Sequence, residues 1–296
     1  MRRRAFGLNL KQLEYFVAIA EERQITAAAH RLNISQPPLS YELRQLESEL
    51  GVTLVVRGPR QARLTEAGQL LYQRATKILA MTAAARREVE SVGSGMTGAL
   101  SLGVCPDCAG LVPAARLREL RDRFPEVSVE VSEGSTSEVL ELLEGGIVDV
   151  GVVRTPFKSE GLRCRFAAAE PLVAIMPTDL EVGSDLSCTL EDLAAVPLAL
   201  SRRQEPAVSS AFAEKGLSPQ VACVMDDVRT CVLWAREGMA VALAPRSLIR
   251  VTDTGDQFIK VVDCRGLDSR PAVVWRADRL LSPLAERAVA LLGELS

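Results

Sequence analysis

The segment SQPPLSYELRQLESELG, residues 35–51, decides how the first part of the chain folds. Its leucines recur at spacings of four, three and four, which predicts an amphipathic helix with one buried face. Ser35 is the expected N-cap, and Gly51 is expected to end the helix. Two prolines cost little in the first turn, because backbone N–H groups there have no partner inside the helix. The predicted buried face consists of Leu39, Leu43, Leu46 and Leu50.

The opposite face of this helix is polar and carries no acidic residue. A helix face that only meets solvent would normally carry acids as well as bases. The absence of acids therefore favours contact with a polyanion. At about 100° per residue, this face holds Pro37, Ser40, Tyr41, Arg44 and Ser48.

Two helical segments are predicted before residue 35. Residues 9–22 (NLKQLEYFVAIAEE) place apolar side chains on one face, and residues 25–32 (ITAAAHRL) follow with Thr26 as the expected N-cap. The arrangement is typical of a helix-turn-helix, whose second helix enters the major groove of DNA by its N-terminal end. A helical domain with a purely structural role is the alternative. The predicted inward-facing residues are Leu10, Leu13, Phe16, Val17, Ala20, Ala28, Ala29 and Leu32.

A basic hairpin is predicted after Gly51. Residues 52–65 (VTLVVRGPRQARLT) indicate two short strands around a Gly-Pro turn, and Arg57, Arg60 and Arg63 bracket that turn. Such a wing suits phosphates or the minor groove. Residues 1–66 contain ten basic and seven acidic side chains, whereas the whole chain has a net charge of −3. The charge asymmetry points the first part of the chain at nucleic acid.

Composition sets outer limits on function. The chain has 296 residues, enough for about two domains, and no apolar run approaches the roughly 20 residues of a membrane helix. A cytoplasmic protein without a membrane partner is expected. His30 is the only histidine, which disfavours Ser-His and Cys-His catalysis and histidine-containing zinc sites. No nucleophile elbow, phosphate loop or dinucleotide fingerprint occurs, so neither catalytic residues, nor a metal, nor a cofactor is expected.

After residue 97 the pattern changes to apolar β-branched runs that alternate with helical segments. This alternation predicts an α/β domain with largely parallel sheets covered on both faces. The predicted strands are residues 100–104, 127–134, 148–153, 171–176, 197–201, 220–225, 240–245, 258–263 and 272–277. The predicted helices are residues 111–124, 137–146 and 228–238, with a final one from about Ser282.

Residues 10–58, followed by RLTEAG (63–68), resemble the N-terminal domain of the LysR-type transcriptional regulators. The resemblance implies a winged helix-turn-helix in which Gln36, Pro37, Ser40 and Arg44 face DNA. Tyr41 departs from the family, many of whose members have arginine there. The arm Arg2-Arg3-Arg4 precedes the usual family start and would add phosphate contacts. The predicted DNA-binding residues are Thr26, Ser35, Gln36, Pro37, Ser40, Tyr41, Arg44, Arg57, Arg60 and Arg63.

The remainder resembles, more loosely, the effector-binding domain of the same family, with two α/β lobes like a type 2 periplasmic binding protein. The resemblance implies crossovers between the lobes near 167–169 and near 264–267. It also implies that the long helix from Thr65 to about Val92 pairs two chains through Leu71, Ile78, Ala85, Val89 and Val92. The alternative is that this helix packs on its own domain. The predicted domains are 1–66, 67–96 (linker helix and hinge) and 97–296, with lobe 1 at 97–167 and 266–296 and lobe 2 at 168–265.

In such sheets a ligand lies beyond the carboxyl ends of the strands, between the lobes. Several of the loops there begin helices, whose N–H groups favour anions, and Arg202 or Arg203 would bind a carboxylate. A small carboxylate effector is therefore predicted, although Asp107 and Asp227 would suit an amine or simply cap helices. The predicted effector-binding residues are Cys105, Asp107, Cys108, Ser135, Thr136, Thr155, Ser201, Arg202, Asp227 and Thr230.

The motif CPDC (105–108) leaves a second function open. Cys105 and Cys108 lie at a dithiol spacing near a helix start, where thiol pKa values tend to fall, which would suit a redox-sensing regulator. A metal site lacks a second ligand pair, and a dithiol oxidoreductase does not fit the first ninety residues. The expected partners are double-stranded promoter DNA, a small effector, a homodimer or homotetramer, and RNA polymerase.

Overall fold

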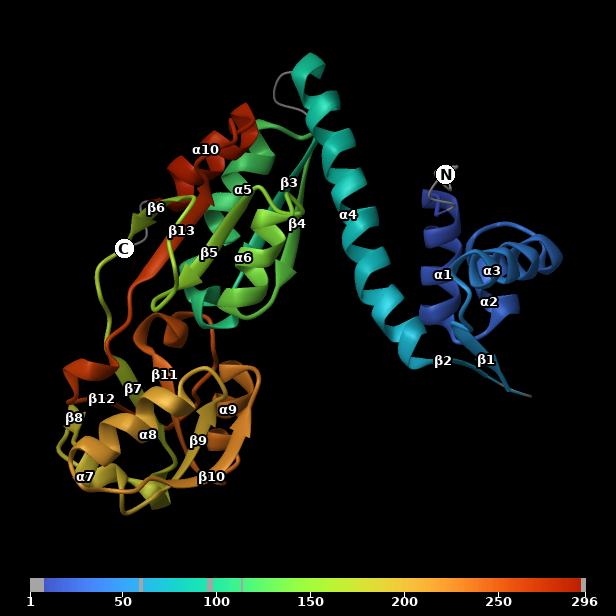
Figure 1. Cartoon of the computed structure of the whole chain (residues 1–296). Coiled ribbons are helices and arrows are strands. Elements are labelled where there is room, and N and C mark those ends of the chain that lie inside the picture. Colours follow the sequence, from blue (N-terminus) through green and yellow to red (C-terminus); the bar gives the residue numbers. More distant parts are fainter. Residues whose placement is uncertain (1–7, 59–60, 95–97, 113, 294–296) are drawn as a thin grey trace. The chain divides into compact units, whose positions relative to one another are not determined.

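The computed structural model describes residues 8–58, 61–94, 98–112 and 114–293. The chain forms two compact units, Met1–Arg86 and Arg87–Ser296 (Figure 1). Arg2, Arg3, Arg4 and Arg60 lie outside the described residues. Among those residues, no helix is both long and apolar enough to cross a membrane.

The first unit is a three-helix domain with a two-stranded wing. Its core gathers Leu13, Phe16, Leu39, Leu46 and Leu54. Leu10 and Leu50 were expected inside but are 45% and 40% exposed, because each lies at a helix end beyond the packed turns. The elements are α1 (Leu10–Glu22), α2 (Ile25–Arg31), α3 (Gln36–Leu50), β1 (Val55–Arg57) and β2 (Ala62–Leu64).

The helix breaks at Asn33 and Gly51 follow the predicted signals. Gly51 caps α3 with a φ of 70°, and Asn33 has a φ of 53° in the break between α2 and α3. The wing strands pair antiparallel, as predicted. Thr65 caps the long helix α4 (Glu66–Ser94), since its Oγ1 accepts a hydrogen bond from the Gly68 N–H. Gly68 allows α4 to approach the wing, because a Cβ there would lie 2.1 Å from the Leu54 carbonyl oxygen.

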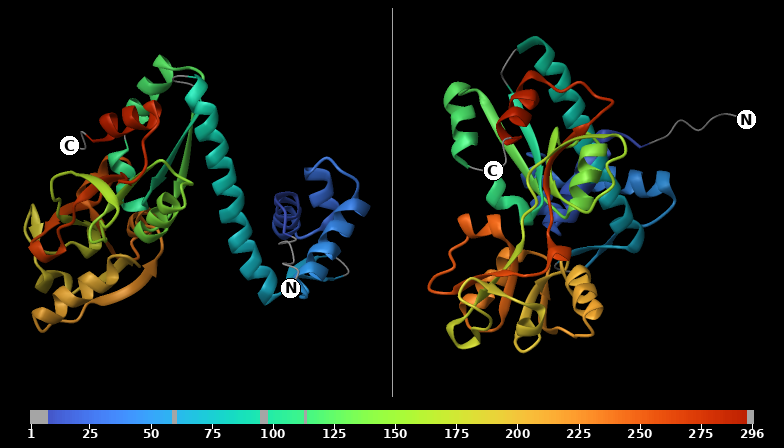
Figure 2. Two further views of the ribbon diagram at one scale, coloured as in Figure 1. Left: turned by 45° about the horizontal axis from the view of Figure 1, so that its top comes forward. Right: turned by 90° about the vertical axis from the view of Figure 1, so that its left-hand side faces the viewer.

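The second unit contains two sheets, which the right-hand view of Figure 2 shows as separate lobes joined by extended segments. Lobe 1 has the strand order β4-β3-β5-β13-β6, and lobe 2 has the order β10-β9-β11-β7-β12-β8. The strands are β3 (Gly98–Val104), β4 (Val127–Glu133), β5 (Val150–Arg154), β6 (Leu162–Phe166), β7 (Leu172–Met176), β8 (Ser187–Cys188), β9 (Pro197–Ser201), β10 (Gln220–Met225), β11 (Val241–Pro245), β12 (Phe258–Val262) and β13 (Pro271–Arg276).

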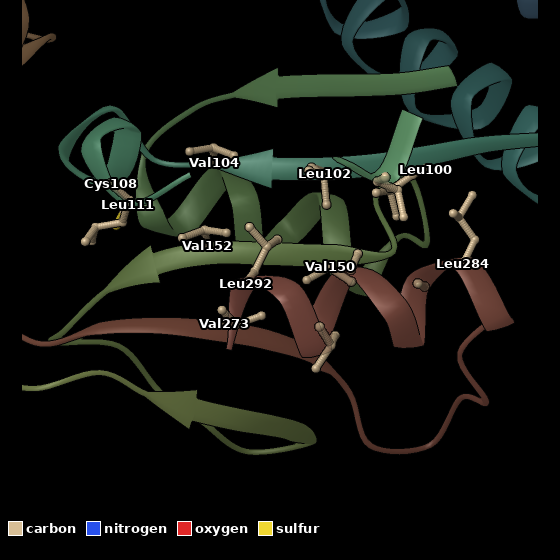
Figure 3. Packing of buried hydrophobic residues seen from close by; sticks show 14 of the residues in the cluster. Leu100, Leu102, Val104, Cys108, Leu111, Val150, Val152, Val273, Leu284 and Leu292 are labelled. Atoms are coloured by element: carbon tan, nitrogen blue, oxygen red, sulfur yellow. The ribbon is translucent and has the colours of Figure 1, made fainter. Parts of the chain in front are cut away.

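Helices cover both faces of each sheet, as the apolar strands predict. In lobe 1, Leu284 and Leu292 pack against one face (Figure 3). Val139 packs against the other face. In lobe 2, Phe212 covers one face and Val232 the other. The helices are α5 (Ala114–Arg123), α6 (Thr136–Glu144), α7 (Leu190–Leu193), α8 (Glu205–Glu214), α9 (Val228–Arg236) and α10 (Pro283–Leu292), with Ser282 as the N-cap of α10.

The chain crosses between the lobes twice. The first crossover joins β6 to β7 and the second joins β12 to β13. The two crossing segments touch through a bridge between Glu170 and Ser269. Leu267 still packs in the lobe 2 core, so the second crossover lies slightly later than the predicted 264–267.

Candidate functional site

The start of α3 presents a polar surface with unused hydrogen-bonding groups. Ser35 is the N-cap, as predicted, but its side chain makes no capping bond. A cap accepts from the second or third helical N–H, and Pro37 and Pro38 stand there without one. Ser35, Gln36 and Pro37 are all exposed. The Ser35 hydroxyl has no hydrogen-bond partner in the part of the chain that the structure describes.

One residue predicted on this exposed face is buried. Ser40 is only 5% exposed, and its Oγ accepts a hydrogen bond of 3.1 Å from Gln36 Nε2. Ser40 lies next to the buried leucine face of α3, so the helices that pack on that face also cover its short side chain. Tyr41 is 61% exposed, and the exposed Arg44 donates from Nε to the Ser40 carbonyl oxygen at 3.1 Å. Of the residues predicted to bind DNA at this face, Gln36, Tyr41 and Arg44 are therefore the long side chains that remain exposed.

The predicted cap of α2 is wrong by two residues. The N-cap is Gln24, whose backbone is extended and whose carbonyl oxygen accepts from the Ala28 N–H, so Thr26 lies inside the first turn. Thr26 is nevertheless exposed. On the wing, Arg63 is exposed opposite Val56, whereas Arg60 and the Arg57 side chain lie outside the described residues.

A cavity of about 1430 Å³ lies between the lobes of the second unit. Glu133–Glu138 and Thr155–Lys158 line it from lobe 1, and Arg202–Gln204 and Asp226–Asp227 line it from lobe 2. The carboxyl ends of the strands meet here, as an open α/β sheet requires. The predicted effector residues at the wall are Cys105, Asp107, Ser135, Thr136, Thr155, Arg202 and Asp227.

Three predicted effector residues do not reach the wall. Cys108 is fully buried, because the six-residue 3-10 helix η1 (Pro106–Leu111) turns its sulfur into the lobe 1 core (Figure 3). Ser201 is 1% exposed at the end of β9, and its Oγ has no hydrogen-bond partner among the residues that the structure describes. Thr230 lies in the first turn of α9 and is not part of the lining.

Two arginines of lobe 2 reach across the cleft to lobe 1. Arg203 forms an ion pair with Asp107 at 2.9 Å and donates to the Thr155 carbonyl oxygen at 2.6 Å. Arg229 binds both carboxylate oxygens of Glu133, at 3.0 and 2.8 Å. Asp107 therefore does not cap a helix, whereas Asp227 caps α9 by accepting from the Arg229 N–H. The sequence left Arg202 and Arg203 open as partners of a carboxylate, and of the two only Arg202 was among the predicted effector-binding residues; Arg202 pairs with Asp226 through exposed side chains.

A buried arginine behind the cleft was not predicted at all. Arg154 ends β5 with no exposed surface and forms an ion pair with Glu170 at 2.6 Å. Its guanidinium also donates to the Asp107 carbonyl oxygen at 2.9 Å and to the hydroxyls of Ser247 and Ser269. These partners come from lobe 1, lobe 2 and both crossovers. A charged residue at the end of an otherwise apolar strand was the available sequence signal.

The two cysteines of CPDC lie side by side. Their Sγ atoms are 3.2 Å apart, and both side chains are buried. The hydrogen bond between the two sulfurs lowers the pKa of the Cys105 thiol, with help from Arg203 and Arg154, and the same bond raises the pKa of Cys108 well above its usual range. The neighbouring sulfur, and not the helix start, is therefore the main cause of the shift.

Comparison with known proteins identifies both parts of the chain. Residues 10–69 match the bacterial regulatory helix-turn-helix protein family model of the lysR family, and residues 93–296 match the LysR substrate binding domain. The chain belongs to the LysR family of transcriptional regulators. This LysR regulator thus combines a DNA-binding winged helix-turn-helix with an effector-binding domain, as the sequence predicted.

Relatives match this LysR regulator along nearly its whole length. It is 29% identical to the transcriptional regulator BsdA of Bacillus subtilis, over 96% of this chain and 100% of BsdA. It is also 29% identical to the regulator CatR of Pseudomonas putida, over 97% of this chain and 99% of CatR. The crystal structure of CbnR, a LysR family transcriptional regulator, superposes with a TM-score of 0.76 at 25% identity and covers 96% of this chain and 98% of CbnR.

Proposed function

We propose that this LysR regulator binds promoter DNA through the start of α3 and the wing, and that a small monocarboxylate in the interlobe cleft modulates that binding. The effector differs in affinity for the open and closed cleft, and that difference sets how far it shifts the regulator. The observation that supports this proposal most directly is Arg203, a cation of lobe 2 at the cavity wall whose side chain binds Asp107 and Thr155 of lobe 1.

The DNA-binding surface is supported by its chemistry. The hydroxyl of Ser35 is unused, Gln36 and Arg44 are exposed donors, and Arg63 supplies positive charge on the wing. Amide and guanidinium groups read base edges, whereas hydroxyls and basic wing residues contact phosphates. Another structure of CbnR, determined in complex with its target DNA, resembles this chain with a TM-score of 0.75 at 25% identity.

A gel-shift assay at fixed salt tests this surface, with a duplex first selected from random sequences by the full-length regulator. Arg44→Ala is expected to weaken binding by roughly 1–3 kcal/mol, about 10- to 100-fold. Gln45→Ala is the matched control, because Gln45 is exposed on the same helix and bonds to Glu49 within it. Equal affinities for the two variants would show that the assigned face is wrong.

The choice of a monocarboxylate rests on the charges around the cavity. Arg203 offers a forked donor pair, and the backbone N–H groups of Thr136 and Ser137 in the first turn of α6 have no partner among the described residues. The lining contains eight acidic and four basic side chains. A polyanion would meet this excess of negative charge, whereas a single carboxylate need only replace Asp107 beside Arg203.

A thermal-shift screen of the reduced full-length regulator against small mono-, di- and tricarboxylates tests this assignment. A binder at about 100 times its Kd adds about 2.7 kcal/mol to stability, and monocarboxylates are expected to give the largest shifts. Arg203→Gln should abolish the shift, while Arg202→Gln, at the exposed neighbouring position, should keep it. Loss of the shift in both variants, or none with any carboxylate, would contradict the proposal.

The oligomeric state and the contact with RNA polymerase are also part of the proposed function. We infer a homodimer or homotetramer paired through α4, contact with RNA polymerase at the promoter, and a cytoplasmic location. The exposed apolar residues of α4, among them Ile78, Met81 and Val89, support the pairing. Redox sensing is a second candidate function, and the 3.2 Å separation of the Cys105 and Cys108 sulfurs is the observation that favours it.

A further inference from the structure

The two sulfurs of CPDC differ in access. Cys105 lines the interlobe cavity, whereas Cys108 lies behind it in the lobe 1 core with no exposed surface. A reagent that enters the cleft therefore meets Cys105 first. Cys108 lies within reach of whatever forms on Cys105, because only 3.2 Å separates the two sulfurs.

The surroundings favour a nucleophilic sulfur at Cys105. The thiolate is the reactive form of cysteine. The Cys108 S–H, Arg203 and Arg154 each stabilise a negative charge on Cys105. By contrast, burial raises the pKa of Cys188 to about 11 and that of Cys231 to about 12.

Asp107, between the two cysteines, links this pair to the cleft. Its carboxylate holds Arg203 of lobe 2, and its carbonyl oxygen holds Arg154. A disulfide requires the two sulfurs to approach to about 2.05 Å. For the sulfurs to come that close, the short helix η1 must change its shape. The same helix positions the carboxylate and the backbone carbonyl oxygen of Asp107.

We propose that Cys105 and Cys108 form a dithiol site for small hydroperoxides, whose oxidation to a disulfide loosens the Asp107–Arg203 pair and so gives the effector cleft a second input. This inference rests on one part of the proposed function, namely that the state of the cleft modulates DNA binding.

The chemistry balances with one hydroperoxide. The Cys105 thiolate attacks the distal peroxide oxygen and breaks the O–O bond, which gives a sulfenic acid and, after protonation, the alcohol or water. The Cys108 sulfur then attacks the sulfenic sulfur, and water leaves. The two sulfurs lose two electrons in total, and the peroxide gains them.

The test treats the full-length protein with hydrogen peroxide, followed by alkylation and peptide mass mapping. In the wild type, the peptide with Cys105 and Cys108 is expected to lose two hydrogens and to resist alkylation until it is reduced. Cys108→Ala should stop at a sulfenic acid that dimedone traps on Cys105. Cys264→Ala, which removes a half-buried cysteine of lobe 2, should behave as the wild type.

Hydrogen–deuterium exchange of the same samples tests the coupling. Peroxide is expected to speed exchange in residues 106–111 and 201–205 of the wild type and to leave Cys108→Ala unchanged there. A folded wild type without the disulfide would overturn the site, and a disulfide with unchanged exchange would overturn the coupling. Because the carboxylate screen uses reduced protein, its failure would count against the proposed effector and not against the dithiol.

Discussion

At the scale of single residues, Arg154 is the charge whose burial most needs compensation. It is fully buried, its ion-pair partner Glu170 is 15% exposed, and hydroxyl and carbonyl oxygens accept from its two terminal nitrogens, whereas its Nε has no hydrogen-bond partner among the described residues. Removal of one partner from a buried pair leaves the other charge unpaired, which costs about 3–5 kcal/mol. Exposed pairs contribute about 0–1 kcal/mol.

Two arginines of this chain allow a buried ion pair to be compared with an exposed one. The Arg154–Glu170 and Arg202–Asp226 pairs have nearly the same length, 2.6 and 2.7 Å, but the latter side chains are 70% and 85% exposed. Arg154→Ala is therefore expected to lower the free energy of unfolding by about 3–5 kcal/mol, and Arg202→Ala by less than about 1 kcal/mol. Urea unfolding followed by circular dichroism measures both. Similar losses would mean that burial does not set the cost.

Residue-level roles were the hardest to predict from the sequence. Arg202 and Arg203 are neighbours of the same type, yet one pairs on the surface with Asp226 and the other crosses the cleft to Asp107. The choice depends on the direction of the loop after β9 and on the position of the other lobe. The spacing of residues along the sequence gives neither the direction of that loop nor the position of the other lobe.

At the scale of elements, hydrophobic periodicity predicted most of the helices and strands. It missed β6, where Arg163 and Arg165 alternate with apolar residues at a half-exposed sheet edge, so that no continuous apolar run marks the strand. It also missed α8, a short helix that buries only a few side chains, among them Phe212. Strands with two buried faces, such as β7 and β11, were the clearest signals.

The helix α4 carries a row of exposed apolar side chains. Ile78, Met81 and Val89 are 37%, 49% and 76% exposed and lie on one side at about 100° per residue, whereas Ala75 is buried in the DNA-binding core. Ile78→Glu with Val89→Glu is therefore expected to weaken chain pairing and to lower the mass found by multi-angle light scattering. Gln73→Glu adds charge on the opposite side and should keep the assembly. An unchanged mass in the double variant would place the interface elsewhere.

At the scale of the whole chain, local patterns predicted the helix-turn-helix, its wing and an α/β domain, whereas the division of that domain into two lobes came only from the resemblance to the LysR family. The predicted boundaries at residues 66 and 96 stay predictions. The compact units divide at Arg86–Arg87, inside α4, because the first turns of that helix pack in the core of the DNA-binding unit. The cross-lobe contacts were not predictable, since they join residues about a hundred positions apart.

Those contacts determine how readily the cleft opens without a ligand. The Arg229–Glu133 pair joins the lobes through side chains that are 37% and 46% exposed, and Asp227 holds Arg229 in place. Glu133→Gln removes this link and leaves Arg203 untouched, so the opening equilibrium should rise by at most about five-fold, the equivalent of about 1 kcal/mol. Hydrogen exchange in residues 133–138 and 227–231 should quicken accordingly.

Ionic strength supplies an independent check on the same pair, because salt screens exposed charges. Added salt should quicken exchange at the cleft wall in the wild type and have less effect in Glu133→Gln. Glu144→Gln removes the same charge from the same lining without breaking a cross-lobe pair and should behave as the wild type. If the two variants exchange alike, the Arg229–Glu133 pair does not hold the cleft, and the other cross-lobe contacts, those of Arg203 and Arg154, hold it instead.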